Sequence, residues 1–481
     1  METPADVLML SVSGLRGTFG GSLTPEVIAR YAVAFASYLR SRAASTGKPR
    51  KGRPQVVVAC DGRIGAEAVK GITISALNLA GCDTGDLGVA ATPTVGLVVD
   101  FLGSDGALQI TASHNPQQWC GLKTIIRSPK AKKGLPNASA PDKTTANEIA
   151  TIYRDGPGKG QPWDKIGTNY LLTDLDVSHA MHVLKVFNTL GINKQIKKQK
   201  YKVIIDDVCA TGKMLAPSTL NELNCKVERL YQQADGIFPH PPEPTQTNLT
   251  ALCKRVRKQR AHLGLAQDPD ADRLALVDDT GTYIGEEYTL VLSAMALAEL
   301  GMLKKGSVVP VNLSTSRMIE DVATTHGFHV VRTPVGEANV VAAMKANKSP
   351  LGGEGNGGVI WPQITYIRDS LGAMALVLAL MAHRKQTLSA IVKQIPPYAI
   401  IKRKIDLTPA IKPADVLDKV AAKWAHNKPD RADGVWVPFH AERAWMHVRA
   451  SNTEPIIRLI AEAPTPEQAE GLLEEAAKLI G

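Results

Sequence analysis

A serine beside a histidine stands where an expected strand ends. Residues 111–116 follow the apolar segment 107–111 and place Ser113 next to His114. Ligands of open α/β sheets bind at the carboxyl ends of strands, so this position favours a nucleophilic or phosphorylatable hydroxyl. A polar turn without a catalytic role is the alternative. The G-x-S-x-G pattern of hydrolases is missing here, which disfavours acyl transfer.

Three aspartates alternate along the next candidate loop. Asp268, Asp270 and Asp272 are two residues apart, and Pro269 favours an extended chain, in which such side chains share one side. Three close carboxylates repel one another unless a cation lies among them, and oxygen ligands of this kind favour Mg²⁺. An EF-hand is disfavoured because its sixth position needs glycine and here holds Arg273. The alternative is a solvated acidic turn, although both flanking segments are apolar.

Five glycines occur within residues 352–358. Because glycine has no side chain, a ligand can approach such a backbone closely. Glu354 and Asn356 are then the only side chains available to recognise it, and a carboxylate and an amide suit sugar hydroxyls. A flexible glycine loop without a ligand is the alternative.

A fourth polar segment, 449–455, precedes an apolar strand that contains a further arginine. Hydroxyl groups, turn N–H groups and forked guanidinium groups together favour a phosphate site, although an ordinary polar turn remains open. The candidate phosphate ligands are Arg449, Ser451, Asn452, Thr453 and Arg458.

The elements that must position these loops alternate between strand and helix. Residues 56–59 form a β-branched run typical of a buried strand, and 66–80 follow as a helix. Thr24 is expected to cap an earlier helix that starts at Pro25. This alternation predicts parallel βαβ units. The tail differs, because three short strands precede one helix over 465–480, which predicts an α+β ending.

Composition excludes several classes of protein. Of the 481 residues, 44% are hydrophobic and 21% are charged, as in ordinary globular domains, which excludes disordered and fibrous chains. The longest apolar run, 371–382, is too short to cross a membrane, and no secretory signal is visible, so we expect a cytoplasmic protein. The six cysteines form no C-x-x-C pair. The net charge of +10 suits anionic partners, but the basic clusters lack the interleaved aromatic residues of a single-strand nucleic-acid binder.

Taken together, the loops resemble those of the α-D-phosphohexomutases, and the resemblance spans nearly the whole chain. Residues 13–17 are similar to the family's S-G-[LIV]-R-G loop, and 111–116 to its phosphoserine loop. Residues 268–273 are similar to its metal loop, 353–358 to its sugar loop and 449–455 to its phosphate loop. The sugar loop departs from many relatives, which place a serine and then a histidine where this chain has Asn356 and Gly358.

The resemblance implies an α/β fold of three related domains with mixed sheets and a C-terminal α+β domain, arranged around a central cleft. The expected domains are 1–160 with the phosphoserine loop, 161–262, 263–390 with the metal and sugar loops, and 391–481 with the phosphate loop.

The resemblance also implies a mechanism for interconverting hexose 6-phosphate and hexose 1-phosphate. Ser113 would carry a phosphoryl group, and Mg²⁺ would be held by it and the three aspartates. A bisphosphorylated hexose would serve as intermediate and activator. Arg16 and Arg273 would neutralise the developing charge, and His114 and Lys123 are candidates for the general acid/base.

The expected partner is a small phosphosugar, with neither nucleic acid nor membrane, and the oligomeric state is left open. The leading prediction for the activity is that of a phosphoglucosamine mutase, and the alternative is a phosphomannomutase/phosphoglucomutase of broad specificity. Two other classes stay open, a metal-dependent phosphatase and a basic nucleic-acid-binding protein. The D-x-D-x-[TV] pattern of one phosphatase class is broken at Asp272, and nucleic-acid binding leaves all four loops unexplained.

Overall fold

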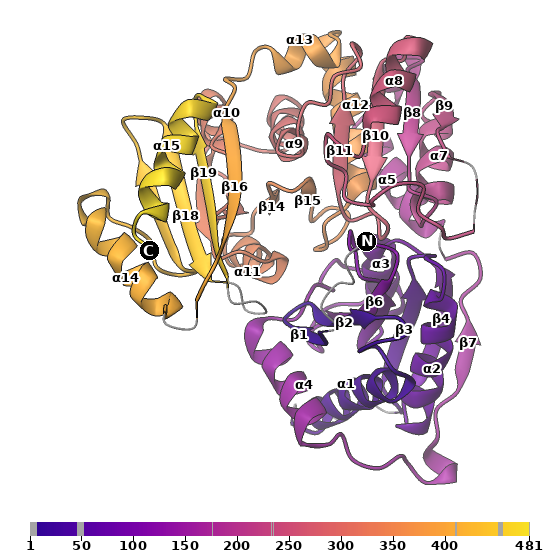
Figure 1. Cartoon of the computed structure of the whole chain (residues 1–481). Helices are drawn as coiled ribbons and strands as arrows, with labels where there is room; N and C mark the ends of the chain where they lie inside the picture. The colour runs from indigo at the N-terminus through magenta and orange to yellow at the C-terminus, as the bar shows by residue number, and fades with distance from the viewer. Residues whose placement is uncertain are drawn as a thin grey trace. The chain divides into compact units, whose positions relative to one another are not determined.

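The computed structural model describes residues 7–45, 52–175, 177–231, 233, 235–408, 411–450 and 456–480. The chain divides into two compact units, each described here by itself (Figure 1). Unit 1 comprises Met1–Thr289 and Gly357–Ser389, and unit 2 comprises Leu290–Asn356 and Ala390–Gly481. In the described part of the chain, no helix is both long enough and apolar enough to cross a membrane.

Unit 1 begins with a mixed seven-stranded sheet in the order β1-β2-β6-β5-β3-β4-β7. Its strands are β1 (Met9–Ser11), β2 (Gly14–Thr18), β3 (Gln55–Cys60), β4 (Asp83–Val89), β5 (Gly106–Ile110), β6 (Trp119–Ile126) and β7 (Asn169–Leu171). Its helices are α1 (Pro25–Ser45), α2 (Ala66–Leu79), α3 (Thr92–Leu102), α4 (Lys143–Asp155) and the short η1 (Trp163–Lys165). Strands β5, β3, β4 and β7 are parallel neighbours, whereas β6 runs antiparallel to both β5 and β2.

The sequence predicted the start of this sheet correctly. The expected strand over 56–59 lies within β3, and the expected helix over 66–80 matches α2. Thr24 caps α1 as expected, because its Oγ1 accepts a hydrogen bond from the N–H of Val27 (3.3 Å). The buried faces of α1 and α2 share one apolar core with β3 and β5.

A second sheet in unit 1 has the order β11-β10-β8-β9. Its strands are β8 (Lys202–Asp206), β9 (Lys226–Arg229), β10 (Leu263–Gln267) and β11 (Leu274–Val277). The accompanying helices are α5 (Ser178–Thr189), α6 (Asn193–Gln199), α7 (Gly212–Glu222), α8 (Thr250–Gln259) and α12 (Ser370–Arg384). Unit 1 also contains β15 (Gly358–Ile360). The apolar helix α12 contacts α5, α6 and β11 in the structure (Figure 1).

The expected boundary between residues 262 and 263 falls inside this second sheet. Strand β10 pairs in parallel with β8, so the two strands on either side of that boundary belong to one sheet. The acidic loop, residues 268–273, lies between β10 and β11. It therefore belongs to the same sheet as β8 and β9, whereas the prediction had placed it at the start of a third domain. Local patterns cannot reveal a pairing between strands about sixty residues apart.

Unit 2 contains a parallel sheet followed by an antiparallel one. The first has β12 (Val308–Asn312) between β13 (His329–Thr333) and β14 (Gly352–Glu354). Its helices are α10 (Met318–His326) and α11 (Glu337–Asn347), with α9 (Tyr288–Glu299) and α13 (Leu388–Val392) at the unit boundaries. The second sheet has the order β16-β19-β18-β17, with β16 (Ala399–Asp406), β17 (Val435–Phe439), β18 (Ala444–Ala450) and β19 (Ile456–Ala463).

One face of the antiparallel sheet is covered by helices. These are α14 (Pro413–Lys423) and α15 (Pro466–Ala477), and the short η2 (Ala425–Asn427) contacts β17. Val416 and Leu473 from the two helices pack in one core with Val437, Met446 and Leu459 from the strands. The three predicted tail strands and the last helix are present, which confirms the α+β ending. Strand β16 was not predicted, because every second residue from Lys402 to Asp406 is exposed and polar.

Candidate functional site

Ser113 occupies a tight turn directly after β5. Its φ is 50°, in the left-handed region, and its side chain is nearly buried. The Oγ1 of Thr111 accepts a hydrogen bond from the N–H of Ser113 (2.8 Å). The hydroxyl of Ser113 donates to Oδ2 of Asp268 over 2.9 Å. The structure thus brings the predicted hydroxyl and the first predicted metal ligand together.

A buried arginine holds this turn in place. The guanidinium group of Arg63 donates to the carbonyl oxygens of Ser113 (2.7 Å) and Trp119, and it forms a buried ion pair with Asp61 (2.9 Å). Asp61 also accepts from Oγ1 of Thr111 (2.6 Å). Sequence reasoning missed both charged residues, although they directly follow β3, at the same edge of the sheet as Ser113.

We expect Arg63→Met to be strongly destabilising. Removing the guanidinium group leaves the Asp61 carboxylate buried without its ion-pair partner, a change that costs about 3–5 kcal/mol in the free energy of unfolding. Arg53→Met is the matched control, since Arg53 is partly exposed beside Asp83 and should cost less than about 1 kcal/mol. Urea unfolding of both variants measures the difference, and equal losses would contradict the structural role of Arg63.

The acidic loop is a turn, and the prediction of an extended chain was wrong. The N–H of Ala271 donates to the carbonyl oxygen of Asp268 (2.9 Å), and Ala271 has a φ of 52°. Oδ1 of Asp268 accepts from the N–H groups of Asp272 and Arg273, both at 3.1 Å. The predicted convergence is nevertheless present, because one oxygen from each of the three carboxylates lies within 4.8 Å of the others.

Two cationic side chains contact these buried carboxylates. Nζ of Lys123 lies 2.6 Å from Asp272 and 3.3 Å from Asp270, and Arg368 donates to Asp272 over 2.6 Å. Although burial opposes ionisation, Lys123 helps to hold the pKa of Asp270 below its usual range, and Arg368 does the same for Asp272. Burial, together with the two neighbouring carboxylates, raises the pKa of Asp268 well above its usual value.

The carboxylate cluster has unused acceptors that fit a metal ion. Oδ1 of Asp270 and Oδ1 of Asp272 are buried and have no hydrogen-bond partner. Leaving buried acceptors unpaired is unfavourable, and carboxylate oxygens are preferred ligands of Mg²⁺. The donor set therefore fits Mg²⁺, with Asp268, Asp270 and Asp272 as the residues that would hold it.

Arg368 is a functional candidate that sequence reasoning missed. It lies 96 residues from Asp272 in the chain and directly precedes Asp369, which caps α12 by accepting from the N–H groups of Leu371 and Gly372. A charged pair directly before a long, apolar helix was the available signal. The cap fixes the start of α12, and this places the Arg368 side chain next to the acidic loop.

His114 lies beside the Ser113 hydroxyl, and two predicted arginines act on His114. Nδ1 of His114 lies 3.4 Å from Oγ of Ser113, and Nη1 of Arg16 donates to Asn115 over 2.9 Å. The positive charge of Arg273, burial and the charge of Arg16 lower the pKa of His114 well below its usual value. These surroundings favour the neutral form of the imidazole.

The predicted sugar-recognising residues lie in unit 2. Oε1 of Glu354 is buried and accepts hydrogen bonds from Asn312 (2.8 Å) and from the N–H of Gly336 (3.3 Å). Asn356 is half-buried two residues later. The carboxylate is thus held in a fixed orientation by Asn312 of β12 and by the backbone N–H of Gly336 at the start of α11.

Two of the five predicted phosphate ligands are described by the structure. Arg449 on β18 and Arg458 on β19 stand directly opposite each other in the antiparallel pair. Nη1 of Arg449 lies 3.5 Å from Asp433. The other three, Ser451, Asn452 and Thr453, lie outside the described residues.

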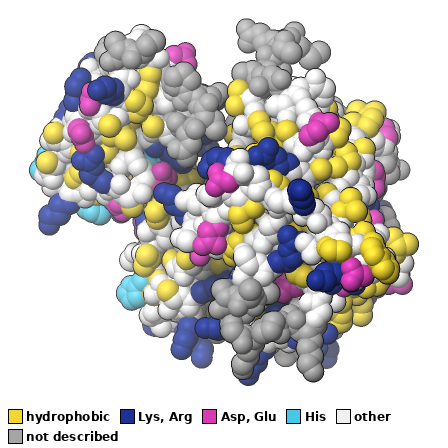
Figure 2. Space-filling view, turned by 90° about the horizontal axis from the view of Figure 1, so that it is seen from below, with side chains coloured by type: hydrophobic (Ala, Val, Ile, Leu, Met, Phe, Trp, Pro, Cys, Tyr) yellow, Lys and Arg dark blue, Asp and Glu magenta, His cyan; other side chains and the backbone are white. Residues whose placement is uncertain are grey.

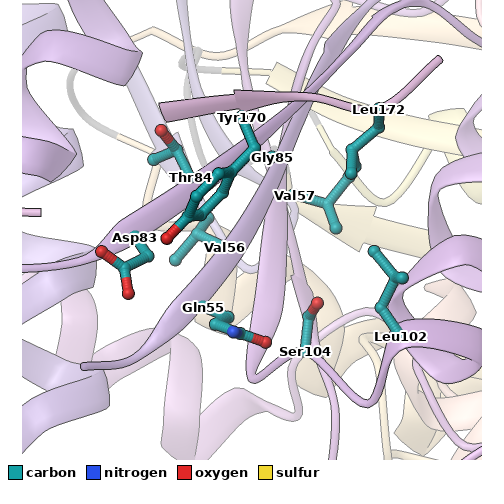
Figure 3. Close-up of a pocket in the computed structure, with 10 residues that line it drawn as sticks. All are labelled: Gln55, Val56, Val57, Asp83, Thr84, Gly85, Leu102, Ser104, Tyr170 and Leu172. Carbon is teal, nitrogen blue, oxygen red and sulfur yellow. The ribbon is translucent and has the colours of Figure 1, made fainter. Parts of the chain in front are cut away.

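A separate cavity in unit 1 contains none of the predicted site residues. Its volume is about 190 Å³, and Tyr170 and Leu172 line one side of it while Val56 and Val57 line another (Figure 3). Asp83 is the only charged side chain in its lining. Its lining offers one carboxylate and no cationic side chain to a phosphorylated ligand, so the Ser113 cluster remains the candidate active site.

Comparisons with known proteins agree with this geometry. Family models described as phosphoglucomutase/phosphomannomutase alpha/beta/alpha domains I, II and III and C-terminal domain match residues 9–153, 179–281, 285–398 and 404–479. The chain is 32% identical to a phosphoglucomutase/phosphomannomutase of Thermococcus kodakarensis, covering 97% of each chain. It is also 32% identical to a probable phosphoglucosamine mutase of Methanopyrus kandleri, covering 97% of this chain and 96% of the relative.

A solved structure supports the fold. The putative phosphomannomutase from Thermus thermophilus superimposes with a TM-score of 0.78 over 100% of both chains, at 24% identity. The predicted α/β architecture, with mixed sheets and an α+β C-terminal domain, is therefore confirmed. The chain belongs to the phosphoglucomutase/phosphomannomutase family, the α-D-phosphohexomutases that its loops resemble.

Proposed function

We propose that this protein interconverts hexose 6-phosphate and hexose 1-phosphate, with Ser113 as the phosphoryl carrier. The observation that carries the proposal is the 2.9 Å hydrogen bond between the Ser113 hydroxyl and Asp268 in a buried carboxylate cluster. Cationic side chains lie on the same cluster, where charge develops during phosphoryl transfer. A neutral histidine beside the hydroxyl supplies a proton acceptor.

The reaction has two half-steps that mirror each other. In the first, the bond between phosphorus and Oγ of phosphorylated Ser113 breaks as a bond to a sugar hydroxyl forms, and His114 accepts the hydroxyl proton. The bisphosphorylated hexose then reorients, and its other phosphoryl group returns to Oγ of Ser113. Arg16 and Arg273 stabilise the transferring group. Lys123, which contacts Asp270 and Asp272, is the second candidate for the general acid/base. Mg²⁺, when bound by the aspartates, neutralises further charge on that group.

Glucosamine 6-phosphate and glucosamine 1-phosphate are the leading substrates. The Methanopyrus kandleri relative is named a probable phosphoglucosamine mutase, which supports this choice. A broad phosphoglucomutase/phosphomannomutase activity is the second candidate, because the Thermococcus kodakarensis relative is similar to the same degree and carries that name. A coupled assay with glucosamine, glucose and mannose phosphates decides between them. A preference for mannose 1-phosphate with no glucosamine turnover would exclude the leading substrates.

We expect Glu354→Gln to lower kcat/KM about tenfold or more on the preferred sugar. A glutamine amide presents only one acceptor oxygen where the carboxylate presents two, and an unmatched polar contact costs about 1–3 kcal/mol. Coupled kinetics measure the loss. Glu442→Gln, an exposed change in the same unit, is the control and should leave kcat/KM unchanged. An unchanged kcat/KM for Glu354→Gln would remove Glu354 from sugar recognition.

The two alternative classes make different predictions for the same protein. A phosphatase would release inorganic phosphate without isomerising the sugar. A nucleic-acid binder would show steeply salt-dependent DNA binding. On the face that Figure 2 shows, described Lys and Arg side chains form separate groups with other side chains between them, which gives no support to a continuous nucleic-acid track.

A further inference from the structure

Three hydroxyl-bearing residues contact the acidic loop, residues 268–273, from outside it. Each stands at the N-terminus of a helix: Thr92 begins α3, Thr211 directly precedes α7, and Ser370 begins α12. All three residues are buried. They come from distant parts of the chain, so their shared position at one loop is a property of the fold of unit 1.

Thr211 and Ser370 bind two backbone carbonyl groups of the loop. The hydroxyl and the N–H of Thr211 both donate to the carbonyl oxygen of Pro269, at 2.7 Å and 3.3 Å. The hydroxyl and the N–H of Ser370 both donate to the carbonyl oxygen of Ala271, at 2.6 Å and 3.4 Å. Each residue therefore contacts its carbonyl group through two donors.

Thr92 contacts the residue between these two. Its N–H donates to the carbonyl oxygen of Asp270 (3.0 Å), and its hydroxyl donates to Oδ2 of the same residue (2.7 Å). Every backbone carbonyl between the first and the third aspartate of the loop thus has a donor from another segment. Mg²⁺ tolerates little departure from octahedral geometry, so residues that fix the ligand-bearing backbone can set its affinity.

The turn that carries Thr211 is strained. Val208 and Cys209 precede it, are buried, and have φ values of 46° and 59°, in the left-handed region. This region is unfavourable for valine, whose side chain is branched at Cβ. A threonine before a helix commonly caps it, but in the described part of α7 the hydroxyl of Thr211 makes no capping contact and donates to Pro269. Such local departures are typical of segments that support a functional site.

We propose that Thr92, Thr211 and Ser370 are positioning residues, which hold the acidic loop in its metal-binding shape before Mg²⁺ binds. The inference rests on the Mg²⁺ site of the proposed function, and it extends that site to residues outside the loop. A loop that already has this shape loses little conformational freedom when the ion binds, so the affinity is higher. Loss of one of these contacts should therefore weaken Mg²⁺ binding, and loss of a similar contact elsewhere should not.

The test uses Thr211→Val, which removes the hydroxyl and keeps the shape of the side chain. Because the Thr211 hydroxyl donates to a backbone carbonyl group, the change leaves the three carboxylates intact. Thr219→Val is the matched control, since Thr219 is a buried threonine of α7 whose hydroxyl donates to the carbonyl oxygen of Leu215 (2.9 Å). Both variants lose one such donor, so urea unfolding with EDTA present should show similar losses of stability.

Calorimetric titration with Mg²⁺ separates the two variants. Thr211→Val should raise the dissociation constant for Mg²⁺ about tenfold, and Thr219→Val should change it less than about twofold. Thr211→Ser keeps the hydroxyl and should restore most of the affinity. If Thr211→Val folds poorly, Ser370→Ala provides the same test, because it removes the hydroxyl contact with Ala271 and should also weaken Mg²⁺ binding.

Amide hydrogen exchange in the metal-free protein measures the shape of the loop directly. With EDTA present, residues 268–273 should exchange faster in Thr211→Val than in Thr219→Val, and equal exchange would contradict the positioning role. Equal Mg²⁺ dissociation constants in the two valine variants would also overturn the inference. Absence of Mg²⁺ binding to the unaltered protein would overturn the metal site and this inference together, whereas Mg²⁺ binding without mutase activity would defeat only the proposed function.

Discussion

Ser113→Ala is expected to lower kcat by at least about a thousandfold while the protein folds normally. The substitution removes the oxygen atom that would carry the phosphoryl group. Two other hydroxyls described near it already have partners: Thr111 donates to Asp61 and Thr92 donates to Asp270. The backbone of the turn should keep its conformation, because Arg63 donates to the carbonyl oxygen of Ser113 and this contact does not involve the Ser113 side chain. Coupled kinetics on the preferred sugar phosphate measure the loss.

Mass spectrometry gives an independent measurement of the same assignment. The active protein should carry a single phosphate, and peptide mapping should place it on Ser113. Ser104→Ala is the matched control, since Ser104 is also buried in the first sheet's domain but lines the separate cavity of Figure 3. Near-normal turnover in Ser113→Ala, or a phosphate on another residue, would remove Ser113 from the carrier role.

The sequence predicted the site best where chemistry and strand ends coincide. Ser113 and the three aspartates each follow a strand that local patterns could identify, and parallel strands bring their carboxyl ends to one edge. The contact between Ser113 and Asp268, 155 residues apart, joins the ends of strands from two different sheets, so that rule alone does not predict it. The reason given for the convergence of the carboxylates was wrong, because a turn at Ala271 brings them together.

The sequence could not predict which side chains from distant segments contact the acidic loop. Arg368, which precedes a helix, and Lys123, on β6, contact the same carboxylate of Asp272. The local sequence of neither segment indicates this contact. The pairing of β10 with β8 likewise moves the acidic loop into a different sheet from the one expected. These contacts depend on tertiary packing, which periodicity and turn chemistry do not encode.

Removing Mg²⁺ is expected to abolish turnover, and adding it back should restore activity. The cluster holds three buried carboxylates, and two of their oxygens have no hydrogen-bond partner. Burial and the neighbouring carboxylates raise the pKa of Asp268, so metal binding must displace a proton there. The affinity for Mg²⁺ should therefore increase as the pH rises, which calorimetric titration at several pH values measures. Full activity after exhaustive EDTA treatment would show that the cluster is structural.

Asp270→Asn is the variant that tests the predicted Mg²⁺ site most directly. Asp268 also accepts from Ser113, and Asp272 pairs at 2.6 Å with both Lys123 and Arg368. Asp270 accepts from the neutral Thr92 hydroxyl, and its contact with Lys123 is longer, at 3.3 Å, so a change there disturbs the charged contacts least. Asp270→Asn should weaken Mg²⁺ binding at least about tenfold while the KM for the sugar phosphate changes little, because the role proposed for this carboxylate is to hold the metal ion. Asp278→Asn is the control, since Asp278 is a buried aspartate of the same sheet that is outside the cluster. An equal loss of Mg²⁺ affinity in both variants would contradict the assignment of Asp270 as a ligand.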